Sequence, residues 1–170
     1  GNTLDDSFAM LTGINDREKL SDLRKEYSQE ASIYMSKNTY LFPESKSMLE
    51  TLKSNGIRIG IISTKYRYRI IEFLELHFPP NFFNIIVGGE DVTYHKPNPE
   101  GLNFAIAHLE SPVNETLYVG DSIIDAETAM KANVDFIGVT TGATTKEELS
   151  VFPNKALVSS LGKEFLDLVI

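Results

Sequence analysis

The N-terminal part of the chain has the hydrophobic pattern of two helices. Apolar side chains recur at helical spacing through residues 4–36, and the sequence Gly-Ile-Asn-Asp at residues 13–16 interrupts the pattern. We therefore expect a helical hairpin here. A proline turn follows, and the pattern then changes in character. We place a domain boundary near Asn38, so that residues 1–38 form one domain and residues 39–170 another.

In the second domain, helical patterns alternate with short apolar runs rich in β-branched residues. The pattern predicts helices at 45–54, 66–76, 99–109 and 123–132 and strands at 57–63, 84–88, 116–120 and 135–140. Two further short helices are expected near 145–149 and 161–169. The runs at 57–62 and 116–119 are almost continuously apolar, which is typical of parallel strands covered on both faces. The predicted fold is α/β, with a doubly wound parallel sheet.

Capping signals mark the start of two of these helices. Asn98 followed by Pro99 supplies a cap and a first-turn proline for one helix. Thr144 and Glu147 have the spacing of a capping box for another. We therefore expect helices to begin at these positions.

The composition narrows the classes of function. Sixteen Lys and Arg stand against 24 Asp and Glu, and a net charge of −8 repels polyanions, so nucleic acid is not an expected partner. There is no cysteine to form disulfides, serve as a nucleophile or bind zinc. No apolar run approaches the roughly 20 residues that span a bilayer, and the N-terminus lacks the pattern of a signal peptide. We expect a soluble, cytoplasmic protein without a membrane partner.

Polar residues follow three of the predicted strands, at the edge where ligands bind in such folds. They are Ser63, Thr64 and Lys65 after the first strand, Lys96 in the loop after the second, and Asp121 and Asp125 after the third. Together they offer a hydroxyl, an ammonium and two carboxylates.

Asp121 and Asp125 are four residues apart, which places them within one helical turn of each other. One interpretation is that both carboxylates face one Mg²⁺ ion, which takes one or two carboxylates together with water and substrate phosphate. The alternative is that Asp121 only favours the helix N-terminus and Asp125 lies in a solvated first turn.

Each of the other candidates also has an ordinary structural explanation. Lys96 before a Pro-Asn-Pro turn fits a phosphate ligand and equally a surface loop. Ser63 can donate to a phosphoryl oxygen or cap a helix. Lys65, Arg67 and Arg69 oppose the dipole of the helix that they begin, so they suit either a substrate anion or a solvated basic face. The three histidines, His77, His95 and His108, lack ligand spacing.

Taken in order, these motifs resemble those of the haloacid dehalogenase superfamily of phosphatases, in particular the phosphoglycolate phosphatase-like branch with a helical cap. Ser63 in IGIISTK matches the family's second motif, and Lys96 in HKPNPE matches the third. Asp121 and Asp125 in YVGDSIIDAETA match the fourth. The resemblance implies a Rossmann-like core, a partial helical cap and hydrolysis of a small phosphorylated metabolite with Mg²⁺.

The family's first motif, an apolar strand that ends in Asp-x-Asp, has no match in the sequence. Asp5-Asp6 follows no apolar strand, and Asp135 begins one. We therefore expect the chain to start inside the cap, without the nucleophile, its acid-base partner and the first core strand. The family sheet places that strand between those at 57–63 and 116–120. We expect a retained N-terminal peptide, a segment swapped from a neighbour or a rearranged sheet to fill the gap.

The resemblance also assigns roles. In the intact family mechanism the first Asp of the missing motif forms an aspartyl-phosphate, and the second protonates the leaving group. Ser63 would bind a phosphoryl oxygen, Lys96 would neutralise charge, and Asp121 would bind Mg²⁺ with Asp125 ligating or orienting. We expect this chain alone to be inactive. Two alternatives are a receiver-type signalling domain, although its acids precede the hydroxyl and lysine, and a noncatalytic phosphate-binding module.

Overall fold

The computed structural model describes residues 4–170, which divide into two compact units. The units comprise residues 4–40 and 41–170, and each is described by itself. In the first, helix α1 (Leu4–Thr12) precedes helix α2 (Arg17–Asn38). The Asp16 carboxylate caps α2 by accepting from the backbone amides of Glu18 and Lys19. The Arg24 guanidinium of α2 pairs with Asp5 of α1 at 3.0 Å, so the expected helical hairpin is present.

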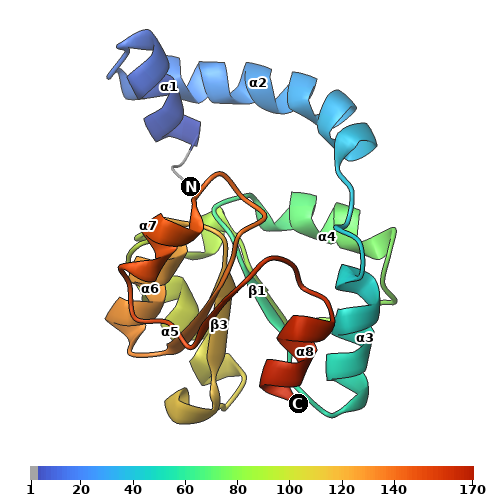
Figure 1. Cartoon of the computed structure of the whole chain (residues 1–170). Helices are drawn as coiled ribbons and strands as arrows, with labels where there is room; N and C mark the ends of the chain where they lie inside the picture. The colour runs from blue at the N-terminus through green and yellow to red at the C-terminus, as the bar shows by residue number, and fades with distance from the viewer. Residues whose placement is uncertain (1–3) are drawn as a thin grey trace. The chain divides into compact units, whose positions relative to one another are not determined.

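The second unit alternates helices with strands (Figure 1). Its α-helices are α3 (Ser45–Ser54), α4 (Arg67–Glu75), α5 (Glu100–His108), α6 (Ile123–Ala132), α7 (Lys146–Ser150) and α8 (Lys163–Val169). Its strands are β1 (Gly60–Ile62), β2 (Ile85–Val87), β3 (Leu117–Gly120), β4 (Asp135–Val139) and β5 (Ala156–Val158). Two 3₁₀ turns, η1 (Gly89–Asp91) and η2 (Val113–Glu115), complete it. The predicted α/β class is confirmed.

All strand pairings in residues 4–170 are parallel, and they form two separate sheets. One sheet pairs β1 with β2, and the other has the order β3-β4-β5. β1 and β3 therefore each have one edge that no described strand covers. The sequence did not indicate β5, because its short run Ala156–Val158 is too brief to show a period.

Helices cover both faces of the strands, as Figure 1 shows. On one face, α5, α6 and α7 build a core with Leu102, Ala126, Leu149 and Phe136. On the other, α3 and α8 pack Met48, Leu52 and Phe165 against Ile137 and Val158. A third cluster joins α4 to the loop before β2 through Leu74, Phe78 and Phe82. Burial on both faces explains why the strands are apolar almost throughout.

The two helix starts that were predicted from capping signals are each shifted by one residue. The helix expected from Pro99 begins at Glu100, with Pro99 as its cap residue, while Asn98 accepts from the Glu100 amide at 3.0 Å. The capping box predicted for Thr144 and Glu147 is formed instead by Thr145 and its partner Glu148. Both Thr-x-x-Glu pairs exist in the sequence, so the spacing alone did not decide between them.

Candidate active site

Two carboxylates that are four residues apart in the sequence lie in different surroundings at the end of β3 and the start of α6. Asp121 directly follows β3 and is exposed, whereas Asp125 lies in the first turn of α6 and is 5% exposed. Ser122 caps α6 by accepting from the Asp125 amide at 3.2 Å. Asp121 therefore faces solvent, whereas Asp125 faces the interior of the protein.

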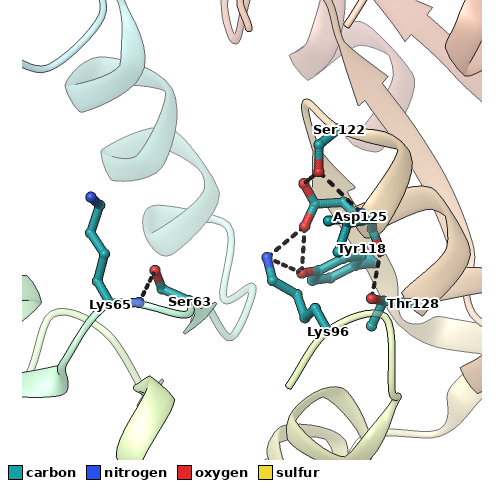
Figure 2. A network of polar contacts seen from close by, with 8 residues as sticks. Ser63, Lys65, Lys96, Tyr118, Ser122, Asp125 and Thr128 are labelled. Carbon is teal, nitrogen blue, oxygen red and sulfur yellow. Dashed lines mark hydrogen bonds and ion pairs between the residues drawn. The ribbon is translucent and has the colours of Figure 1, made fainter. Parts of the chain in front are cut away.

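Lys96 and Asp125 form a buried ion pair. The Lys96 ammonium lies 2.6 Å from Asp125 Oδ1, and the two side chains are 15% and 7% exposed. Figure 2 shows the ammonium pointing at the Asp125 carboxylate from the loop before α5. Of the four residues that the sequence brings forward as the core of the site, these two are joined directly.

The Asp125 carboxylate is fully hydrogen-bonded. Oδ1 accepts from Lys96 and from the Tyr118 hydroxyl at 3.2 Å, and Oδ2 accepts from the Ser122 hydroxyl at 2.6 Å. Burial by itself would raise the pKa of Asp125, but the charge of Lys96 and these hydrogen bonds outweigh burial and hold the pKa below its ordinary value. Asp125 is thus an ionised group whose oxygens are already engaged by the protein.

Tyr118 is the second buried partner of this pair. Its hydroxyl also lies 3.4 Å from the Lys96 ammonium. Burial, followed by the negative charge and hydrogen bond of Asp125 and the charge of Asp121, raises the pKa of Tyr118 far above its ordinary value. The hydroxyl therefore stays protonated and donates to Asp125.

The loop that carries Lys96 is attached to the start of α5. The Glu100 carboxylate accepts from the backbone amides of Thr93 and Tyr94 at 2.8 and 2.9 Å. These two hydrogen bonds, from Thr93 first, lower the pKa of Glu100. The peptide bond between Lys96 and Pro97 is cis. The residues that precede Lys96 are thus tied by hydrogen bonds to the first residue of α5.

Asp121 keeps its carboxylate available. Among the described residues no hydrogen-bond or ion-pair partner contacts it, and Gly142 in the loop after β4 lies close to it. A methyl group at Gly142 would lie 2.2 Å from Asp121 Oδ2, so this position has room only for glycine while the carboxylate stays in place. Gly120 has the same relation to Asp125, whose Cβ would lie 2.3 Å from an added methyl group.

Ser63, Thr64 and Lys65 follow β1 and make no direct contact with Lys96 or Asp125 in the part of the chain that the structure describes. The Ser63 amide donates to Val87 at 2.9 Å, and its Oγ accepts from the Lys65 amide at 3.1 Å. In Figure 2 the Lys65 side chain extends away from Lys96. The structure therefore brings together Lys96 and Asp125 directly, but not these three residues.

The basic residues at the start of α4 have structural partners. The Arg67 guanidinium pairs with Asp91 at 3.2 Å, and the Arg67 amide donates to both oxygens of Glu90. A carboxylate at this helix N-terminus offsets the unfavourable cations. The Arg69 guanidinium lies 5.4 Å from the ring centroid of Tyr68. These contacts explain two of the three cations without a substrate anion.

Two members of the polar network, Tyr118 and Ser122, were not predicted. Ser122 precedes the helix and has an acid three residues later, which is the spacing of a capping box. Tyr118 is the one residue with a hydroxyl inside the run Leu117–Gly120, next to Gly120-Asp121. Both signals are present in the sequence, but each also describes an ordinary structural residue.

A hollow of about 260 Å³ lies elsewhere in the unit of residues 41–170. Its lining is mostly apolar and includes Ile71, Leu74, Phe78, Phe82, Phe83 and Ile86. None of the predicted site residues lines it. Among the described residues, no helix is long and apolar enough to cross a membrane, and no group of three or more acidic or histidine side chains is placed to hold a metal ion jointly.

Comparison with known proteins gives concordant matches. The family model described as haloacid dehalogenase-like hydrolase matches residues 1–139. A structure assigned to haloacid dehalogenase-like hydrolases from Bacteroides fragilis is 55% identical and superposes with a TM-score of 0.91, covering 95% of this chain and 77% of that one.

Curated relatives carry more specific names. The phosphoglycolate phosphatase of Salmonella choleraesuis (strain SC-B67) is 28% identical over 134 residues, which are 79% of this chain and 53% of that protein. Pyrophosphatase PpaX of Oceanobacillus iheyensis is 38% identical over 98 residues, or 58% of this chain and 46% of that protein. The chain spans about half the length of the curated relatives it matches.

Proposed function

Because the chain belongs to the haloacid dehalogenase-like hydrolase family, we propose that the whole protein hydrolyses a small phosphomonoester with the help of Mg²⁺. The observation that carries the proposal is the buried pair of Lys96 and Asp125 beside the exposed carboxylate of Asp121. A fixed cation next to an acid with available oxygens suits a phosphate and its metal ion. The relative named phosphoglycolate phosphatase supports a phosphomonoester, whereas the relative named pyrophosphatase points to a phosphoanhydride as the second candidate substrate.

Lys96, Ser63 and Lys65 have different proposed roles. The Lys96 ammonium neutralises phosphoryl oxygens, and Asp125 keeps that ammonium charged and directed. Ser63 uses its hydroxyl proton to donate to a phosphoryl oxygen, because its Oγ already accepts from the Lys65 amide. Thr64 and the exposed Lys65 ammonium contact the part of the substrate away from the phosphoryl group.

Only one of the two carboxylates has oxygens available for Mg²⁺. Mg²⁺ binds through one or two carboxylates, with water and substrate phosphate completing the octahedron. Asp121 fits, because its oxygens have no protein partner among the described residues, whereas both oxygens of Asp125 are engaged. We therefore propose Asp121 as the direct ligand and Asp125 as the residue that orients Lys96. When bound, the ion would neutralise charge that develops on the phosphoryl group.

The nucleophile of the proposed reaction is not among these residues. No Asp-x-Asp follows an apolar strand in the sequence, and the family chemistry takes place through an aspartyl-phosphate. We propose that a polypeptide of these 170 residues binds phosphate and Mg²⁺ with turnover at background. The noncatalytic phosphate-binding module thus remains a second candidate for the isolated chain. The family match gives no support to the receiver-type alternative.

Isothermal titration with inorganic phosphate in the presence of Mg²⁺ tests this proposal. Lys96→Met should weaken phosphate binding by at least about 30-fold, because it removes one partner of a buried charge pair. Lys131→Met removes an exposed lysine from α6 and should leave binding unchanged. Equal phosphate affinity in Lys96→Met and the original protein would contradict the proposal. Robust Mg²⁺-dependent hydrolysis of p-nitrophenyl phosphate by the 170-residue chain would refute the expected lack of turnover.

Two parts of the architecture also receive proposals. We propose that the helical unit α1–α2 belongs to a cap that contributes to substrate choice, in keeping with its being a compact unit of its own. The uncovered edges of β1 and β3 favour a further strand, from a retained N-terminal peptide or a segment swapped from a second copy. Nucleic acid is not a proposed partner, and the cytoplasmic location expected from the sequence stays a prediction.

A further inference from the structure

Tyr118 lies at the meeting point of the hydrophobic core and the Lys96–Asp125 pair. Its ring belongs to the core between β3 and α6, and Tyr118 stands opposite Phe136 in the β3–β4 register with ring centroids 6.5 Å apart. Its hydroxyl is within hydrogen-bond distance of both partners of the ion pair. Figure 2 shows the three polar ends forming a closed triangle.

A hydroxyl can contact both members of the ion pair, because it donates to a carboxylate and accepts from an ammonium. A tyrosine hydroxyl has one proton to donate and lone pairs that accept. With its proton directed at Asp125 Oδ1 at 3.2 Å, its lone pairs remain for the Lys96 ammonium at 3.4 Å. Phenylalanine would offer neither group.

Lys96 needs such a second contact because its side chain is flexible. Four rotatable bonds carry a large rotamer entropy, and the contact with Asp125 at 2.6 Å fixes the ammonium in one direction only. A tyrosine has two side-chain torsions, and Tyr118 as a residue is only 8% exposed. Its hydroxyl is therefore a rigid point against which the ammonium is held.

We propose that Tyr118 is a positioning residue, whose hydroxyl holds the Lys96 ammonium in the direction in which it meets a bound phosphate. This inference rests on the proposed function for the phosphate and on the observed contacts for the positioning. Ordered donors bind an anion with less loss of entropy than mobile ones, so the hydroxyl strengthens phosphate binding without touching the phosphate. Tyr118 thereby extends the site into the core of the fold.

The variant Tyr118→Phe tests the proposal, because it keeps the ring and removes only the hydroxyl. Phosphate affinity, measured by titration with inorganic phosphate and Mg²⁺, should fall about five- to tenfold. Thr128→Val is the matched control. It removes a fully buried hydroxyl on α6 that donates to the Ile124 carbonyl at 2.7 Å, and it should leave phosphate affinity unchanged. Equal affinity in Tyr118→Phe and the original protein would overturn the positioning role.

A second measurement needs no phosphate. The Lys96 ammonium should give a slowly exchanging, motionally restricted signal in ¹H–¹⁵N NMR spectra, identified by its absence in Lys96→Arg. Tyr118→Phe should increase the mobility of that signal, while Thr128→Val should not. A mobile ammonium in the original protein would overturn the inference, even if Tyr118→Phe fails to fold. Absent phosphate binding in the original protein, with a restricted ammonium, would contradict the proposed function and leave the positioning of Lys96 supported.

Discussion

Lys96 and Asp125 form a buried ion pair, so the effect of each residue on the free energy of unfolding depends on the other. Removing one partner of a buried ion pair leaves a charge that is neither solvated nor neutralised. Lys96→Met should therefore lower the free energy of unfolding at pH 7 by about 3 kcal/mol, measured by urea denaturation. The double variant Lys96→Met/Asp125→Asn, which leaves no unpaired charge, should recover part of that loss. A double variant as unstable as the sum of the two single ones would show that the pair is not coupled.

The same pair predicts a direction of pH dependence. Folding lowers the pKa of Asp125 below its ordinary value of 3.8. Burial opposes this shift, but the charge of Lys96 and the hydrogen bonds from Lys96, Ser122 and Tyr118 together outweigh it. The stabilisation is therefore present at pH values above 3.8 and is lost as the pH falls through the lower pKa of the folded state. In Lys96→Met this source of acid sensitivity is absent. The difference in stability between the original protein and the variant should shrink in acid, and a constant difference would contradict the assignment.

Gly142 gives a prediction about the proposed metal ligand. An added methyl group would lie 2.2 Å from Asp121 Oδ2, at the outer end of a short side chain that can rotate away. Gly142→Ala should thus weaken Mg²⁺ binding about tenfold, as changes around metal ligands commonly do. Its effect on unfolding should stay within about 1 kcal/mol. Isothermal titration with Mg²⁺ measures the first, and Thr141→Ala in the same loop is the control. Unchanged Mg²⁺ affinity in Gly142→Ala would remove Asp121 from the metal site.

At the residue scale the sequence yields candidates but not their surroundings. Residue type and place after a strand brought Lys96, Asp121 and Asp125 forward, and only their joint order, which resembles the family motifs, set them apart from ordinary loop and capping residues. They could not show that Asp125 is enclosed by three donors while Asp121 is exposed, because that difference depends on the packing of α6 against β3. The proposed role of Tyr118 was hidden for the same reason, since its ring alone explains its presence in an apolar strand.

Among the elements, helix α7 allows the predicted cap residue, Thr144, to be tested against the observed one, Thr145. Thr145 Oγ1 accepts from the Glu148 amide at 3.2 Å, and the Glu148 carboxylate accepts from the Thr145 amide at 2.8 Å. The hydrogen bond from the Thr145 backbone amide is the largest cause of the lowered pKa of Glu148. Because Leu149 of this helix is fully buried, weakening α7 should affect the stability of the whole unit.

Thr145→Ala should therefore reduce the free energy of unfolding by about 1 kcal/mol. Thr144→Ala, at the cap that the sequence predicted, should change it by less than about 0.5 kcal/mol. Urea denaturation of both variants makes the comparison. A larger loss for Thr144→Ala would restore the predicted boundary and contradict the observed one.

The order and type of the longer elements were predictable because their apolar period is clear. The strand predicted at residues 57–63 is ordered as a strand only at Gly60–Ile62, since ladder hydrogen bonds and not hydropathy set its ends. β5 was missed because three residues carry no period. Pairing between strands far apart in the chain leaves no local signal, so the separation into two sheets could not be predicted from periodicity.

In the unit of residues 41–170 as a whole, some strands are paired on both sides and others on one side only. β4 is paired on both sides, with β3 and β5, whereas β1 pairs only with β2 and β3 only with β4 among the described strands. Unpaired backbone groups at a buried position are costly, and at an exposed edge they attract another strand. The edges of β1 and β3 therefore suit the further strand that we propose.

Hydrogen exchange followed by NMR tests that proposal on the intact protein. If a further strand pairs there, backbone amides that point outward from β1 and β3 should exchange as slowly as those of β4, because exchange then requires the sheet to open. Protection that grows with protein concentration, together with a dimer in light scattering, would identify a swapped segment. Protection that does not depend on concentration would identify a retained peptide, which mass spectrometry would detect. Fast exchange at both edges in a monodisperse monomer would contradict either source, since backbone groups that exchange freely with water have no strand beside them.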